Sequence, residues 1–147
     1  MSKRESVAWH VSLAGRVLSR TIEAELTEHD LGRGEYRVLF ALAEREGLTQ
    51  TDLVEQHHLE KSSIARVVAQ LESKGYVERR PDPDDGRRKR LHLTDAGREL
   101  REDIAAVKDR VESQLTEGLS VEERSALVEH LRTACRNLDV DLQEDET

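Results

Sequence analysis

Two serines and an arginine, Ser62, Ser63 and Arg66, stand where a stretch with helical spacing of apolar residues begins. At a helix N-terminus, hydroxyl and backbone N–H groups can bond phosphates or base edges, and an arginine one turn later can bond a guanine edge twice. We predict that these three residues read bases, the alternative being an ordinary polar helix face. Four more polar residues in these two predicted helices and beside them are candidate contacts to DNA: Thr49, Gln50, Lys61 and Gln70.

A second basic group follows the turn-forming run PDPDDG and comprises Arg87, Arg88, Lys89 and Arg90. A flexible basic hairpin beside a helix docked in a groove can insert an arginine into the narrow, negative minor groove. Asp85 lies two residues before Arg87 and can orient it through a charge-assisted ion pair. We predict DNA contacts from these residues, including Asp85. The alternative is a solvated turn whose surface ion pair contributes little to stability.

The elements that must position both groups are predicted between residues 34 and 97. Thr49 can cap a short helix, and a tight turn leads from it to an amphipathic helix that ends near Gly75. An alternating segment with turn residues then predicts a β-hairpin. Because Pro81 and Pro83 cannot donate backbone hydrogen bonds, we expect a two-stranded hairpin docked on the helices. This order is a helix-turn-helix with a wing, which can place its second helix in a major groove.

Longer helices are predicted on both sides of this core, so the expected fold class is mainly α with a small β-wing. Gly32 and Gly34 are expected to interrupt the first helix before a second one that Gly47 ends. Thr94 can cap a long helix, and Ser120 begins a capping box for the last one. Apolar stripes mark the first and last helices: Val7, Val11, Ala14, Leu18, Ile22 and Leu26, then Leu127, Leu131, Ala134 and Leu138.

The composition narrows the class of protein. A chain of 147 residues fits one folded unit, and with 36% apolar against 37% charged residues it has no run approaching the roughly 18 apolar residues of a membrane helix. The polar N-terminus argues against export, so we expect a cytoplasmic protein without membrane partners. The single cysteine, Cys135, excludes an intramolecular disulfide. Few aromatic residues favour helices packed through Leu, Val and Ala, in part against a partner subunit.

The charge is unevenly distributed along the chain. The formal net charge is −8, but from Lys61 to Thr94 nine Lys and Arg face five Asp and Glu, a net of +4 that leaves −12 for the rest. The whole chain therefore has the balance of an acidic protein, whereas the segment with the predicted DNA contacts is basic.

The run QTDLVEQHHLEKSSIARVVAQLESKGYVERRPDPDDGRRKRLHLTDAG resembles the winged helix-turn-helix core of the MarR family of transcriptional regulators. The wing signature of that family is matched by Asp85, Arg87, Leu91, Leu93 and Thr94, with Asp95-Ala96-Gly97 after it. The pattern of its recognition helix is matched by Lys61, Ser62, Ser63, Arg66, Leu71, Gly75 and Val77. The flanking helices also fall where the family has its dimerisation helices, so the resemblance covers nearly the whole chain.

The resemblance implies a ligand-responsive, sequence-specific regulator, expected to be a repressor, that binds a pseudo-palindromic site in double-stranded DNA as a homodimer. A two-fold dimer would place the half-sites roughly 34–36 Å apart. It also implies one unit over 1–147, with a DNA-binding core at 34–97, dimerisation helices at 5–30 and 98–139, and an acidic tail at 140–147. Effectors in this family tend to bind near the junction of these regions and shift the spacing of the DNA-binding lobes.

Three residues are candidates for an effector pocket: Trp9, Arg16 and Tyr36. The alternative is that Trp9 and Tyr36 are core or dimer contacts. We expect neither a metal nor a cofactor. His57 and His58 are adjacent and would point about 100° apart on a helix, which is poor geometry for one ion.

Three other classes of function fit the sequence less well than a specific regulator. A non-specific architectural DNA-binding protein would carry positive charge over most of its surface, whereas this chain carries −12 outside the basic segment. A winged helix can also bind proteins, although basic residues on both predicted DNA-contacting elements favour DNA. The sequence contains no GxSxG, P-loop or HExxH motif and no Gly-rich nucleotide turn, so we predict that the protein is not an enzyme.

Overall fold

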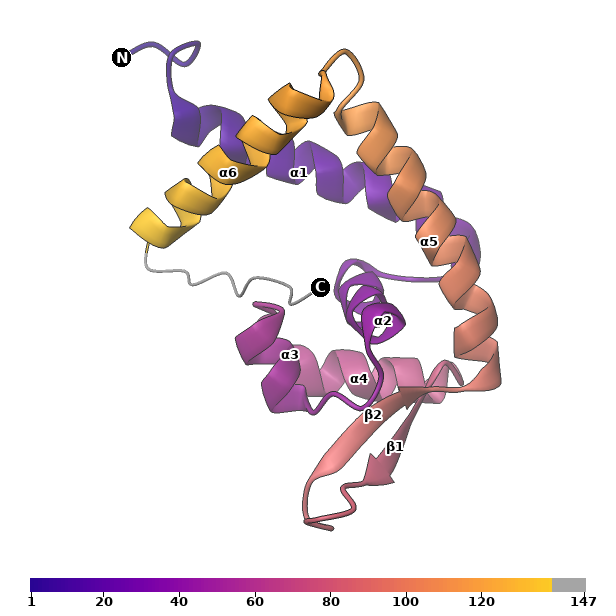
Figure 1. Cartoon of the computed structure of the whole chain (residues 1–147). Coiled ribbons are helices and arrows are strands. Elements are labelled where there is room, and N and C mark those ends of the chain that lie inside the picture. Colours follow the sequence, from indigo (N-terminus) through magenta and orange to yellow (C-terminus); the bar gives the residue numbers. More distant parts are fainter. Residues whose placement is uncertain (139–147) are drawn as a thin grey trace. The chain divides into compact units, whose positions relative to one another are not determined.

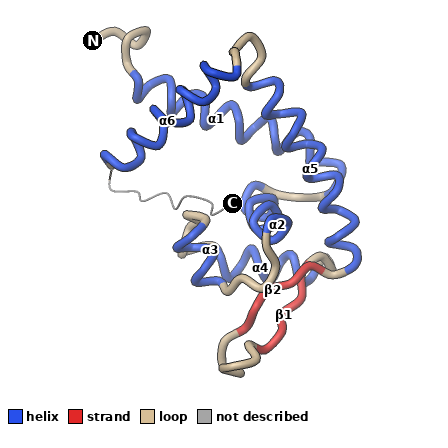
Figure 2. Tube along the Cα trace, in the orientation of Figure 1, coloured by secondary structure: helices blue, strands red, loops and turns tan. Residues whose placement is uncertain are grey.

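The computed structural model describes residues 1–138, which are mainly helical with one small antiparallel sheet, as predicted (Figures 1 and 2). Within them, no helix is both long and apolar enough to cross a bilayer. The predicted tail at 140–147 and the end of the segment at 98–139 lie outside the described residues. The elements are α1 (Val7–Leu26), the 3-10 helix η1 (Thr27–His29), α2 (Arg33–Glu44), α3 (Gln50–Gln56), α4 (Ile64–Ser73), β1 (Val77–Pro81), β2 (Lys89–Leu93), α5 (Asp95–Leu115) and α6 (Val121–Asn137).

The chain divides into two compact units, Met1–Val111 and a second unit that begins at Glu112. The first contains α1 to α4, both strands and most of α5. The second contains the end of α5 and α6.

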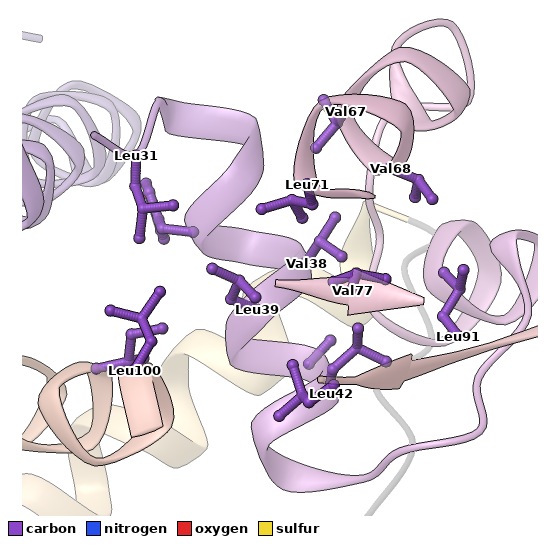
Figure 3. Close-up of a cluster of buried hydrophobic side chains, with 14 of the residues drawn as sticks. Leu31, Val38, Leu39, Leu42, Val67, Val68, Leu71, Val77, Leu91 and Leu100 are labelled. Atoms are coloured by element: carbon purple, nitrogen blue, oxygen red, sulfur yellow. The ribbon is translucent and has the colours of Figure 1, made fainter. Parts of the chain in front are cut away.

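The core of the first unit is formed by α2, α4, the strands and α5 (Figure 3). Leu39 and Leu42 of α2 and Val68 and Leu71 of α4 belong to this core, and all four residues are at most 1% exposed. Leu91 of β2 is equally buried. Because these residues recur every three or four positions in the helices, each helix buries one face and leaves the other in solvent.

Gly34 lies inside α2, so the prediction that it interrupts the helices is wrong. A Cβ added at Gly34 would lie 2.8 Å from Cγ2 of Val67 in α4, so the glycine allows these two helices to approach closely. The break after α1 is made by η1 and by Asp30, whose φ of 55° is left-handed. Gly32 then takes the N-cap position of α2.

The strands form the predicted antiparallel hairpin, which ends with Pro81 opposite Lys89 (Figure 2). The sheet has two strands, as predicted. Leu91 N donates to Leu48 O and Gly47 N donates to Leu91 O, both at 2.8 Å, so the chain before α3 adds an isolated bridge to β2. Gly47 follows α2 by three residues and has a φ of +83°, a turn that brings Leu48 to the strand. These contacts dock the wing on the helices.

The start of α5 is fixed to the base of the wing. Thr94 Oγ1 accepts a hydrogen bond from Gly97 N at 3.1 Å, which confirms the predicted cap. The Thr94 backbone N–H donates to Tyr76 O at 3.1 Å. A Cβ at Gly97 would lie 2.2 Å from Tyr76 O, so only glycine fits where α5 crosses the start of β1.

In the second unit, α6 begins with the predicted capping box. Ser120 Oγ accepts from Glu123 N at 3.1 Å, and Glu123 Oε1 accepts from Ser120 N at 2.9 Å. Leu127, Val128 and Leu131 of α6 are exposed although they are large and apolar.

Candidate nucleic-acid interface

A reciprocal capping box begins α3. Thr49 Oγ1 accepts from Asp52 N at 3.0 Å, and Asp52 Oδ2 accepts from Thr49 N at 2.9 Å. The Thr49 residue is only 6% exposed, and its hydroxyl is engaged by the first turn of the helix. The neighbouring Gln50, the first residue of α3, is half-buried. A contact at this place would therefore come from Gln50 or from the backbone.

The predicted tight turn between α3 and α4 is present, with His58 in the left-handed region at a φ of 55°. A second turn follows, and α4 begins at Ile64 with Ser63 in the N-cap position. Ser62 and Ser63 thus immediately precede the helix. Ser63 Oγ donates to Glu60 O at 3.4 Å, whereas Ser62 is exposed.

The α4 helix packs through its apolar face and presents polar groups on the other. Lys61, Ser62 and Arg66 are exposed, which is the placement that base reading requires. Beside them, a cavity of about 200 Å³ lies between α4 and α2. Arg66 and Ser63 line it on one side and Arg37 on the other.

Gln70 lies one turn after Arg66 and is half-buried. A carboxylate only accepts and a guanidinium only donates, so the Gln70 amide is oriented by its two neighbours. With the amide assigned on this basis, its nitrogen donates to Glu35 Oε1 at 3.2 Å, and its oxygen accepts from Arg66 Nη1 at 3.3 Å. Both ends of the amide are thus engaged inside the protein, whereas the sequence suggested a contact with DNA.

In the wing, the arginine that an aspartate orients is Arg90. Its Nε donates to Asp82 Oδ2 and its Nη1 donates to Gly47 O, both at 2.8 Å. Asp82 is 5% exposed, and the hydrogen bond from Asp84 N, together with Arg90, lowers its pKa against the opposing effect of burial. Arg90 therefore ties the hairpin to the loop before α3, where the sequence suggested a DNA contact.

Asp85 acts on the backbone of the hairpin. Its Oδ1 accepts from Arg87 N at 3.1 Å, and its carbonyl accepts from Arg88 N at 3.0 Å. The predicted orienting effect on Arg87 thus operates through the main chain and not through the guanidinium. Arg87, Arg88 and Lys89 are exposed at the end of the hairpin, where basic side chains can meet phosphate or enter a minor groove.

A cavity of about 180 Å³ lies between the start of α3 and the wing. Arg88 and Lys89 line it together with Gln50 and with Arg79 of β1. Arg79 was not among the sequence candidates, although the run ERRP carries two adjacent arginines. Its Nε donates to Glu72 Oε1 at 2.5 Å, which holds it beside α4. Two of the predicted basic residues of the hairpin, Arg88 and Lys89, thus meet the predicted Gln50 of α3 at one surface.

Glu46, in the loop after α2, joins the wing to α5. It accepts from Leu93 N at 2.9 Å and from Arg98 Nη2 at 3.1 Å, and it lies 3.7 Å from His92 Nδ1. Burial acts to raise the pKa of Glu46, but the hydrogen bonds from Arg98 and the Leu93 backbone outweigh it and lower the pKa. No local motif marked this residue.

The candidate pocket residues lie in different surroundings. Trp9 is 36% exposed on α1 and contacts the ring of His10. Arg16 is exposed on the same helix, whereas Tyr36 is 4% exposed and packs against Phe40 in the core. The two cavities above are lined by other residues. Of the two alternatives for Tyr36, an effector pocket or the core, the structure therefore shows packing in the core.

Comparison with known proteins gives the same family by several routes. Residues 29–88 match the model of the MarR family. The transcriptional regulator HosA of Escherichia coli O111:H- is 31% identical over 103 residues, which are 70% of this chain and 76% of that protein. The aligned segment spans 66% of the length of one curated relative, 61% of a second and 87% of a third.

Two solved structures match over most of both chains. A MarR family regulator from Listeria monocytogenes, complexed with 26mer DNA, has a TM-score of 0.85 at 20% identity and covers 91% of this chain and 89% of its own. At that identity the match shows the fold alone. CouR from Rhodococcus jostii RHA1, bound to p-coumaroyl-CoA, has a TM-score of 0.81 at 25% identity and covers 99% of each chain.

Proposed function

Because the chain belongs to the MarR family of transcriptional regulators, we propose that it acts as a homodimeric repressor that binds a pseudo-palindromic operator and releases it when a small molecule binds. Base readout is assigned to Ser62, Ser63 and Arg66, and phosphate or minor-groove contacts to Arg87, Arg88 and Lys89.

One observation carries this proposal: the exposed face at the start of α4 and the exposed basic end of the wing both belong to the first unit, and both lie in the basic segment of an otherwise acidic chain. A helix in the major groove with a basic hairpin beside it can read bases and bind the backbone at once. The acidic remainder keeps the affinity for random DNA low, which favours a specific regulator over an architectural protein.

The exposed apolar residues support a homodimer. On α6, Leu127, Val128 and Leu131 are between 41% and 50% exposed, and on α1 Val11 and Val17 are 47% and 44% exposed. Water-exposed stripes of this kind at both ends of a chain are typical of helices that bury them against a second copy. We expect the predicted dimerisation segments to interlock across a two-fold axis.

Release by a small molecule is supported by CouR, whose structure holds p-coumaroyl-CoA. An effector that binds more tightly to the form of the dimer unable to span two half-sites would lower operator occupancy. This step needs no change in the base-reading residues themselves.

Paired arginine variants test the proposal. The probes are an operator duplex, selected by the wild-type protein from a random library, and a random-sequence duplex of equal length. Arg66→Ala should cost about 1–3 kcal/mol on the operator and relax the preference at one base position. Arg88→Ala should weaken binding to both duplexes alike. Equal losses on both duplexes for both variants would contradict the base-reading assignment.

A further inference from the structure

Glu35, the third residue of α2, is a buried carboxylate with more partners than its ion pair requires. It is 6% exposed, and its Oε2 accepts from Lys74 Nζ at 2.7 Å. The same oxygen accepts from Gly32 N at 3.4 Å at the start of α2. The hydrogen bond to Glu35 raises the pKa of Lys74. These contacts compensate the charge, and they involve one oxygen only.

The other oxygen of Glu35 faces α4. In the amide orientation that these two charged partners require, Oε1 accepts from the Gln70 nitrogen at 3.2 Å, and the Gln70 oxygen accepts from Arg66 Nη1 at 3.3 Å. Arg66, Gln70 and Lys74 are spaced by four residues, so they follow one face of α4 and its end. A fixed point in the core is thereby linked to an exposed guanidinium.

We propose that Glu35 is a positioning residue for base recognition, which acts through Gln70 to hold the guanidinium of Arg66 in one orientation. This inference rests on the proposed function, in which Arg66 reads a base. A free arginine side chain must be ordered when it binds a base edge, and that ordering reduces affinity. An arginine already held by Gln70 loses less freedom on binding, and its fork is directed toward one position in the groove.

The chain provides variants that separate positioning from stability. Gln70→Met removes both hydrogen bonds to the amide and preserves the length of the side chain. Glu35→Gln removes the charge from which the chain of hydrogen bonds begins. Lys74→Met is the matched control, because it breaks the ion pair of Glu35 and leaves Gln70 and Arg66 in place.

The readout is the base-preference profile of each variant in a random duplex library, together with the ratio of dissociation constants for the selected operator and a random duplex. Because both constants come from one preparation, the folded fraction cancels in the ratio. Gln70→Met and Glu35→Gln should lower the preference at the position that Arg66→Ala affects, by about twofold to tenfold. Affinity for the random duplex should stay unchanged. Lys74→Met should lower the unfolding midpoint and leave the profile as in wild type.

A double variant completes the design. In Arg66→Ala with Gln70→Met, the profile should equal that of Arg66→Ala alone, because Gln70 then has nothing to position. A wild-type profile for Gln70→Met would overturn the inference, and so would a Lys74→Met profile as flat as that of Gln70→Met. A wild-type protein without any base preference would refute the proposed function itself, a result distinct from either of these.

Discussion

Replacing Gly97 by alanine tests the close approach of α5 to the chain that begins the wing. The added Cβ would lie 2.2 Å from Tyr76 O and 3.3 Å from Leu93 Cβ, whereas carbon and oxygen atoms normally stay more than about 3.3 Å apart. The obstacle is backbone, which no side-chain rotation can relieve. The start of α5 must therefore move by about 1 Å from the base of the wing.

This displacement has a cost that can be estimated. Overpacking of this kind typically destabilises a protein by about 1–3 kcal/mol, and loss of the Thr94 N to Tyr76 O hydrogen bond adds about 1 kcal/mol. We expect Gly97→Ala to lower the free energy of unfolding by about 2–4 kcal/mol. Urea denaturation followed by circular dichroism measures it, at one protein concentration for all variants because dimer stability depends on concentration.

Gly86→Ala is the matched control. Gly86 has open space around it and no left-handed φ, so alanine should leave the stability unchanged or raise it by up to about 1 kcal/mol. A Gly97→Ala protein within about 0.5 kcal/mol of wild type would refute the close packing of α5 on the wing. Equal destabilisation by both variants would show that the short distance from the added Cβ to Tyr76 O is not the cause.

Two further predictions concern stability. The pKa of Glu46 is lowered in the folded protein, so its contribution to stability is present at neutral pH and is lost as the pH falls through the carboxylate range. The difference in unfolding free energy between wild type and Glu46→Gln should therefore shrink between about pH 5 and pH 3. A difference that stays constant over this range would exclude this explanation. Leu42 is 0% exposed, so Leu42→Ala should lower the unfolding free energy by about 2–5 kcal/mol in the same denaturation assay. The control is Leu138→Ala, because Leu138 is exposed; measured where the protein is monomeric, it should lower the unfolding free energy by less than about 0.5 kcal/mol.

The elements of this fold were predictable where the signal is local. The caps by Thr49, Thr94 and Ser120 each use a residue three positions away, so the sequence alone predicted three helix starts. The run PDPDDG predicted the hairpin for the same reason, because turn residues act on their immediate neighbours. The role of Gly34 was predicted wrongly, because the glycine is required by its close approach to Val67 on another helix.

The site was predictable as a set of exposed basic residues but not as a set of contacts. Arg90 binds Gly47 O across 43 positions, and Glu35 binds Lys74 across 39. A local pattern carries no information about such pairs, so it could not separate the structural Arg90 from the exposed Arg88. Likewise Asp82 and Asp85 occur in one turn, and only the three-dimensional structure shows that Asp82 is the buried one.

Whether the protein binds DNA with sequence specificity can be measured in one titration. Wild-type protein is titrated against a labelled fragment of the upstream region of its own gene and against a shuffled fragment of equal length, over a range of salt concentrations. We expect a preference of about a thousandfold or more for the upstream fragment, with both affinities falling as salt rises. Equal affinity for the two fragments at every salt concentration, or binding to neither, would contradict it.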